Sequence, residues 1–214
     1  MADRTTVDGA LFPFYGLPTR SIENFTVDLG VPVGFWRSVG YSLNCFFVEC
    51  FIDEVAAALK RDPLELRREL LAKSPRHLAV LEAAARRAGW GRPAADVNGQ
   101  KVYRGLAQTM GFGSYVAACA EVSVNTKGEL KVHRIVAATD SGHAVNPQQI
   151  EAQVEGSFAY GLSAALYGQC TLKDGRIEQT NFHSYPPVKM ADMPRVETIV
   201  MPSTCPGSRP LSCP

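Results

Sequence analysis

The chain has 214 residues and a formal net charge of +1, with 46% hydrophobic and 20% charged residues, as in ordinary globular proteins. No run of Lys and Arg exceeds a pair, so the sequence predicts no nucleic-acid partner. No apolar run approaches the roughly 20 residues of a membrane span, and the N-terminus lacks the layout of a signal peptide. We therefore expect a cytoplasmic chain without a membrane span. A periplasmic location is the alternative if an export signal lies upstream of this sequence.

The six cysteines do not form a metal-binding pattern. Zinc sites favour a Cys-x2-4-Cys pair matched by a second pair or by histidines, and neither Cys45 with Cys50 nor Cys205 with Cys213 has that spacing. The four histidines are scattered and form no triad pattern with a serine, cysteine or aspartate. The sequence therefore predicts no metal site and no catalytic residue, and reduced, mostly buried thiols.

The first third of the chain is expected to contain one strand and one helix. Residues 1–33 are rich in turn formers, and within them "NFTVDLG", residues 24–30, alternates as a strand does. Residues 42–60, "SLNCFFVECFIDEVAAALK", place apolar side chains at helical spacing. This pattern predicts a helix that is largely buried.

Two further helices follow. Asp62 stands where an N-cap belongs and Pro63 at the first helical position, where proline costs least. Another helix is expected from Pro75 to near Gly89. Residues 91–100 carry Gly, Pro and Asn without an apolar pattern and are predicted to be a connector.

The second half changes to hairpins around one long helix. "YVAACAEVSV" and "ELKVHRIVAATD" flank the turn "NTKG", and a second hairpin is expected around residues 173–175. Between them a helix of about six turns should begin with Asn146 as cap and Pro147 after it, and "PRVETIVMP" is a last strand. Helices with antiparallel hairpins indicate an α+β fold, without alternating βαβ units.

The long helix carries a candidate ligand site in "IEAQVEGSFAYGL", residues 150–162. Each of its two glycines costs about 1 kcal/mol relative to alanine inside a helix. Gly156 lies beside Gln153 at helical spacing, so its missing side chain leaves a notch next to an amide. The alternative is helix-on-sheet packing, through the apolar stripe Ile150, Val154, Phe158 and Leu162. Glu151 and Glu155, four residues apart, are expected to be solvated.

A second candidate is "GFWRSVG", residues 34–40. Arg37, flanked by Trp36 and bracketed by glycines, can present its five-donor fork to an anion. A cation–π or surface contact within a turn explains the same residues, and chemistry alone does not separate the two.

Several long motifs, in order, resemble a known family. "VPVGFWRSVGYSLNCFFVECFIDEVA", "GSYVAACAEVSV" and "VNPQQIEAQVEGSFAYGLSAALYGQC", with the stretch that follows to "IVMPST", are similar to the large, molybdenum-binding subunit of the xanthine oxidase family. The nearest subgroup is the isoquinoline 1-oxidoreductase β-subunit and related bacterial aldehyde dehydrogenases. The resemblance implies a molybdopterin cofactor, leaving open its cytosine dinucleotide form. It also implies oxygen insertion from water into an aldehyde or N-heterocycle and electron transfer to a small iron–sulfur subunit.

The resemblance assigns roles to individual residues. Arg37, with Trp36 before it, matches the family's Phe-Arg-Gly-Phe-Gly motif near the molybdenum centre. Gln153 matches the glutamine of the Gln-Val-Glu-Gly segment that binds the pterin, which favours cofactor binding over packing for the notch at Gly156. Val39 falls at the substrate-pocket position of this motif. Ser38 and Val39 stand where the family has Gly and Phe, so the resemblance implies no aromatic stacking of substrate there.

The resemblance ends near residue 204, after "IVMPST". The family continues to a segment with the glutamate that activates water, whereas this chain reads "CPGSRPLSCP". We therefore expect residues 1–204 to be a partial molybdopterin-binding domain, mainly helical over 34–90 and mixed over 100–204, with 205–214 an unmatched tail. The expected chain is a C-terminal-half fragment, inactive alone, whose partner is the missing N-terminal half. The alternative is a non-catalytic packing or assembly fragment of a split or degenerate gene.

Overall fold

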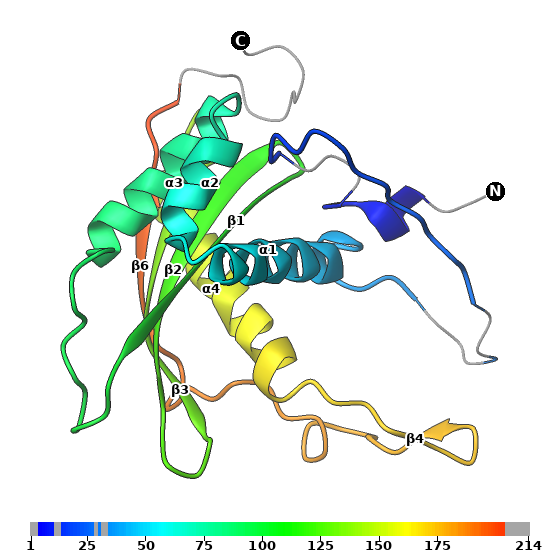
Figure 1. Ribbon diagram of the computed structural model, residues 1–214. Coiled ribbons are helices and arrows are strands. Elements are labelled where there is room, and N and C mark those ends of the chain that lie inside the picture. The colour runs from blue at the N-terminus through cyan, green and yellow to red at the C-terminus, as the bar shows by residue number, and fades with distance from the viewer. Residues whose placement is uncertain (1–3, 11–13, 28–29, 31–33, 204–214) are drawn as a thin grey trace.

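The fold is a four-stranded sheet with helices packed around it (Figure 1). The computed structural model describes residues 4–10, 14–27, 30 and 34–203. The unmatched tail expected at 205–214 lies outside these residues. The elements in chain order are η1 (Arg4–Val7), α1 (Tyr41–Ala58), α2 (Pro63–Leu70), α3 (Pro75–Ala88), β1 (Tyr103–Gly111), β2 (Ser114–Val124), β3 (Leu130–Asp140), α4 (Pro147–Leu166), β4 (Leu172–Lys173), β5 (Arg176–Ile177) and β6 (Arg195–Val200).

The strands are joined by tight antiparallel hairpins, as an α+β fold requires. β1 pairs with β2 up to Gly111 opposite Ser114, and the two turn residues Phe112 and Gly113 have φ of 52° and 84°. Positive φ at both positions is the twist that two-residue hairpins favour. β2 pairs with β3 across the expected 125–128 turn, and β4 pairs with β5 across the other expected turn. β1 is a strand that the sequence analysis did not assign.

The last strand makes a connection that the sequence did not predict. β6 pairs with β3 in parallel, and α4 lies between the two strands in the chain and contacts β6. Parallel neighbours need a crossover of a dozen or more residues, usually a helix, which is what α4 provides. The hairpins of the expected α+β fold are thus joined by one parallel pairing that the sequence did not predict, and the sheet is mixed.

The main core lies where α3 covers the sheet. α3 contacts β1, β2 and β3. Its fully buried side chains include Val80, Leu81 and Ala84, and they pack with Val136 and Ala138 of β3. Burial of side chains of this size contributes about 1.5–3 kcal/mol each, so this interface accounts for much of the stability. Among the described residues, no helix is long and apolar enough to cross a membrane.

The predicted helix boundaries are confirmed by their caps. The Asp62 carboxylate accepts hydrogen bonds from the backbone N–H of Leu64 and Glu65 at 2.8 and 3.1 Å. The Asn146 side chain accepts one from the N–H of Gln149 at 3.3 Å. α3 ends at Gly89, whose φ of 72° is the left-handed conformation typical of a helix stop.

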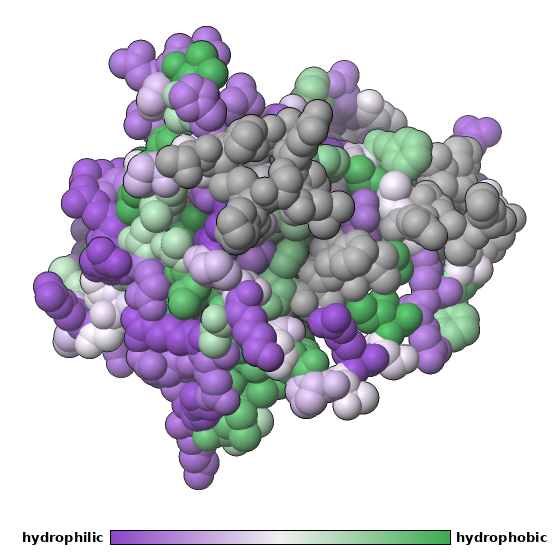
Figure 2. Space-filling model, turned by 90° about the horizontal axis from the view of Figure 1, so that it is seen from above, coloured by the Kyte–Doolittle hydropathy of each residue, from purple (hydrophilic) through white to green (hydrophobic). Residues whose placement is uncertain are grey.

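α1 is a helix, as predicted, but it is not largely buried. It packs against α2 and β1 along one side only, so just Glu49, Ile52 and Ala56 are buried. Its other side carries apolar residues that are each more than half exposed, namely Leu43, Phe46, Phe47 and Phe51. Figure 2 shows, on the upper face of the molecule, hydrophobic residues reaching the surface among hydrophilic ones.

Two other expectations fail. Residues 24–27 form no strand, because no other segment pairs with their backbone; positions 28 and 29 lie outside the described residues. The four described cysteines are free thiols, but only Cys119 is buried, and Cys50 and Cys170 are exposed. Cys50 shares α1 with the uncovered apolar face, and Cys170 lies in the extended segment after α4, so neither has a core to enter.

Candidate functional site

The segment 34–40 forms a turn that leads directly into α1. The backbone N–H of Val39 donates to the Trp36 carbonyl at 3.0 Å, and the Ser42 hydroxyl donates to the Arg37 carbonyl at 2.6 Å. Gly40 is buried, and a Cβ there would overlap the carbonyl oxygen of Thr5 in η1. Glycine is therefore required where this turn passes η1, and the turn holds Arg37 outward.

Arg37 stacks on the long helix. Its guanidinium carbon lies 4.2 Å from the ring centroid of Tyr160 in α4. This is a cation–π contact, the alternative that the sequence left open, although with Tyr160 and not with Trp36, which is 52% exposed. Among the described carboxylates none forms an ion pair with Arg37. Its side chain is exposed, so its N–H groups can bind a ligand from solvent.

Gln153 and Gly156 lie on the same side of α4 as Tyr160. Residues 153 and 160 are seven positions apart, which is two helical turns and about 10 Å along the axis. Gln153 is exposed, and a Cβ added at Gly156 would meet nothing within 4 Å, so the notch is open. The structure thus places Arg37, Tyr160 and Gln153 along one exposed strip, which we call the Arg37–Gln153 strip.

The other side of α4 faces the protein. The predicted stripe is half-buried at Ile150, Val154, Phe158 and Leu162, whereas Glu151 and Glu155 are exposed as expected. No residue of α4 is fully buried. Gly161, the second glycine of this segment, also faces open space, so no close approach of a neighbouring element requires a glycine there.

Two residues of the turn have strained backbones. Ser38 and Val39 have φ of 66° and 49° without being glycine. The left-handed region costs a residue with a Cβ about 1–2 kcal/mol, and it is least favourable for a β-branched one. Val39 is half-buried in this turn, and it lines neither the open groove at Ile199 nor the small cavity at Tyr15.

We expect Ser38→Gly to stabilise the protein. Glycine adopts φ of 66° without the Cβ penalty, and its greater freedom in the unfolded chain offsets part of the gain, so the expected net effect is about 0.5–1 kcal/mol. Urea titration followed by circular dichroism measures it. Ser38→Ala keeps the Cβ and serves as the control; equal gains from both variants would show that strain at this position is not the cause.

A buried polar cluster behind the turn was missed by the sequence analysis. Arg67 of α2 is 0% exposed, and its Nε donates to Glu49 of α1 at 3.1 Å and to the Tyr15 hydroxyl at 3.1 Å. Glu49 also accepts from the Tyr15 hydroxyl at 2.7 Å and from the Gln108 backbone N–H at 3.0 Å. Burial raises the pKa of Glu49, an effect that the nearby Arg67 opposes. The cluster ties α1, α2 and β1 together.

His77 of α3 extends this cluster. The Gln108 amide nitrogen donates to Glu49, so the Gln108 amide oxygen faces His77 and accepts a hydrogen bond from its Nδ1–H. The Nε2 of His77 is then an unprotonated acceptor, and it is buried with no hydrogen-bond partner among the residues that the structure describes. Burial lowers the pKa of His77 to about 4. The imidazole is neutral, lies between Phe14 and Tyr115, and was not singled out from the sequence.

Within the part of the chain that the structure describes, no group of three or more His, Cys, Asp or Glu side chains is placed to hold a metal ion. A cofactor held by the Arg37–Gln153 strip would therefore be bound through its organic part. The donors available for it are the Arg37 guanidinium and the Gln153 amide.

Comparison with known proteins bears on this strip. The family model for the molybdopterin cofactor-binding domain matches residues 52–194, a range that includes all of α4. The β-subunit of isoquinoline 1-oxidoreductase from Brevundimonas diminuta is 33% identical over 183 residues, 85% of this chain and 23% of that protein. A nicotinate dehydrogenase subunit from Pseudomonas putida is 28% identical over 221 residues, 94% of this chain and 18% of that protein.

A third relative and one solved structure complete the comparison. The membrane-bound aldehyde dehydrogenase [pyrroloquinoline-quinone] of Gluconacetobacter polyoxogenes is 28% identical over 204 residues, 86% of this chain and 26% of that protein. The chain thus spans between 18% and 26% of the length of these relatives. The crystal structure of quinoline 2-oxidoreductase from Pseudomonas putida aligns with a TM-score of 0.41 and 21% identity, over 44% of this chain and 13% of that one.

Proposed function

The chain belongs to the molybdopterin cofactor-binding domain family of molybdenum-binding subunits, and on that premise we propose that the Arg37–Gln153 strip holds part of the cofactor. The observation that carries this proposal is the position of Arg37 over Tyr160, 4.2 Å from its ring, on the side of α4 that presents Gln153. Two segments more than one hundred residues apart in sequence meet on one surface, and each contributes an exposed polar side chain.

The residues of the strip fit a molybdopterin. Its phosphate suits the Arg37 fork, because two parallel N–H groups of a guanidinium can bind one phosphate. The pterin edge alternates donors and acceptors, and the Gln153 amide offers one of each. Among the described residues no hydrogen bond to protein engages that amide, and the space at Gly156 is open.

Each residue has a separate task in the proposed site. Tyr160 holds the guanidinium of Arg37 flat, so less freedom is lost when an anion binds. Trp36 lies next to Arg37 and is exposed enough to cover a bound ring. When bound, the cofactor supplies a molybdenum centre for oxidation with oxygen taken from water. Val39 stays assigned to the substrate pocket.

We propose that the complete site needs further polypeptide. Arg37 and Gln153 are both exposed, so water would reach a cofactor held by this chain alone. The substrate would be an aldehyde or an N-heterocycle, the classes named in the relatives, and the electrons would pass to a small iron–sulfur subunit. The same proposal includes the cytosine dinucleotide form of the cofactor. It also includes a partner polypeptide that supplies the rest of the large subunit. The isolated chain would show no hydroxylase activity.

The exposed face of α1 favours a second candidate, a non-catalytic packing or assembly role. Leu43, Phe46, Phe47 and Phe51 present a contiguous apolar surface, and surfaces of this kind mark sites of association. Under this alternative the chain would associate without carrying molybdenum. Light scattering combined with molybdenum analysis of the same fraction separates the two roles.

The test of cofactor binding is the molybdenum and pterin content of the full chain, purified from a host that makes the cofactor. We expect Arg37→Ala to lower the retained content by about 10- to 100-fold, since a charge-assisted hydrogen bond contributes about 1.5–3 kcal/mol. Arg37→Lys keeps the charge without the fork and should lie between. Elemental analysis and the fluorescence of the oxidised pterin report the content.

The matched control is Arg176→Ala, which removes an exposed arginine of β5. It should leave the content unchanged. A wild-type chain without molybdenum, or an Arg37→Ala chain that retains as much as the control, would refute cofactor binding by the strip in this chain.

A further inference from the structure

β6 forms one end of the sheet. Its partner on one side is β3, and within the described residues no strand pairs with its other edge. Six residues of extended chain span about 20 Å, enough for a ladder of several hydrogen bonds. An unpaired edge of this length can accept a strand from another polypeptide.

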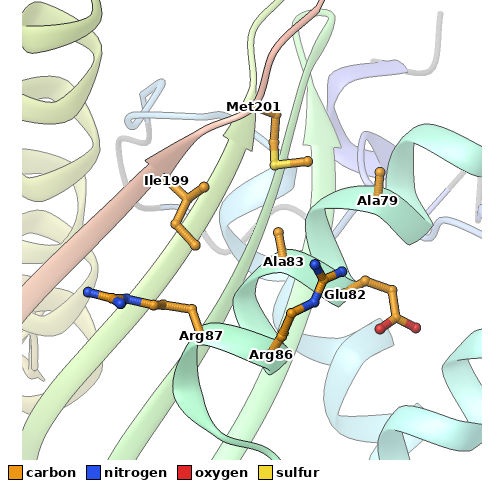
Figure 3. Close-up of a pocket in the computed structure, with 7 residues that line it drawn as sticks. All are labelled: Ala79, Glu82, Ala83, Arg86, Arg87, Ile199 and Met201. Atoms are coloured by element: carbon orange, nitrogen blue, oxygen red, sulfur yellow. The ribbon is translucent and has the colours of Figure 1, made fainter.

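An open groove of about 640 Å³ runs beside this edge, between β6 and α3 (Figure 3). Ala79 of α3 lies at the same end of the groove as Met201, and Ala83 faces Ile199 in the middle. These four side chains give the groove an apolar floor. Side chains of an added strand that point toward α3 would cover this floor.

The opposite end of the groove is cationic. Figure 3 places Arg86 and Arg87 at this end, with their guanidinium groups on opposite sides of it and Glu82 directed away from β6. Glu82 is already neutralised by Arg68. Among the described residues Arg86 forms no ion pair.

The only acidic side chain of β6 does not change this balance. Glu197 is shared by three arginines, at 3.0 Å from Arg87, 2.9 Å from Arg134 and 3.3 Å from Arg195. Arg134 is also paired with Glu121, at 3.6 Å. Two carboxylates against these three guanidinium groups leave a net positive charge at this end of the groove. A ligand that fills the groove should therefore be apolar at one end and acidic at the other.

We propose that the free edge of β6 and this groove bind an extended segment of a partner polypeptide, with acidic side chains near Arg86 and Arg87 and apolar ones over Ile199 and Met201. Main-chain hydrogen bonds to β6 supply affinity, and the charge gradient sets the direction of the segment. A second copy of this chain fits less well, because its β6 would bring further arginines to a cationic groove.

The probe is the heptapeptide acetyl-Glu-Thr-Glu-Thr-Leu-Thr-Leu-amide, together with the peptide of reversed sequence, added to the full chain. In an extended peptide the alternate positions face one side, so its two Glu and two Leu side chains can all face the groove. We expect one of the two peptides to bind at least tenfold more tightly than the other. The expected resonance shifts in isotope-labelled protein fall on β6 and α3.

Three comparisons make the test sharp. Replacing Glu by Lys in the peptide should abolish binding, and methylating alternate backbone nitrogens should weaken it at least tenfold without changing side chains. Arg86→Glu should also weaken binding at least tenfold, whereas Arg176→Glu, at an exposed arginine of β5, should not. Circular dichroism checks that both variants are folded.

Three results would overturn the proposal. One is the absence of shifts on β6 and α3 with either peptide at millimolar concentration. Another is equal weakening by Arg86→Glu and Arg176→Glu. The third is a concentration-dependent dimer that occupies β6 in the absence of peptide, which would assign the edge to a second copy. None of these outcomes depends on whether the Arg37–Gln153 strip binds cofactor.

Discussion

Replacing Arg67 by methionine is expected to lower the free energy of unfolding by about 3–5 kcal/mol, because it leaves the buried carboxylate of Glu49 without its cation. Arg67 is fully buried and its guanidinium bonds to side chains and backbone of α1 and to the Tyr15 hydroxyl. The N-terminal segment and α1 would both lose their hydrogen bonds to α2. Urea titration followed by both far-ultraviolet and near-ultraviolet circular dichroism measures the change.

Arg68, the next residue on α2, provides the matched control. Its guanidinium pairs with Glu65 and Glu82 but is 38% exposed, so Arg68→Met should cost about 1 kcal/mol or less. Adding Glu49→Gln to Arg67→Met removes the uncompensated charge and should restore part of the loss, as a double-mutant cycle would show. Equal costs for the two arginine variants would refute the role of the buried pair.

Lowering the pH from about 6.5 to 4 is expected to destabilise the protein by about 2–4 kcal/mol through His77 alone. Burial lowers the pKa of His77 from 6.5 to about 4 in the folded protein. Over this range the unfolded chain binds a proton at this histidine and the folded chain does not, so folding becomes less favourable as pH falls. Each unit of pKa difference corresponds to about 1.4 kcal/mol.

Other groups titrate nearby, so the measured quantity is the difference between wild type and His77→Gln. The raised pKa of Glu49 acts in the opposite direction, since the folded protein then binds that proton more readily than the unfolded chain. The lowered pKa values of Glu82 and Glu197 add a destabilisation that begins as the pH falls through about 4.5, at the acidic end of this range. Chemical denaturation at several pH values should show a smaller loss in His77→Gln than in wild type. His183→Gln, at an exposed loop position, should keep the full loss, and an unchanged slope in His77→Gln would refute the assignment.

The candidate site was partly accessible from sequence. Arg37, Gln153 and Gly156 were selected from local motifs, and the structure places them along one side of α4. Tyr160, which contacts Arg37, was not predicted as part of the site. A single tyrosine in a helix gives no local indication that an arginine from a distant turn packs on its ring. The buried cluster around Arg67 was missed for the same reason, since its hydrogen-bonded pairs lie between 18 and 59 residues apart in sequence.

The sequence by itself determined the local elements, because their causes are local. The caps Asp62 and Asn146, the prolines that follow them and the turns at 125–128 and 173–175 act through neighbouring backbone groups, and those elements are present. Only the tertiary structure decided how they combine. The parallel pairing of β6 with β3, the uncovered face of α1 and the contact of Arg87 with Glu197, 110 residues apart, depend on which segments meet after collapse. Burial of a side chain and pairing of a strand edge are properties of that assembly, and no local pattern encodes them.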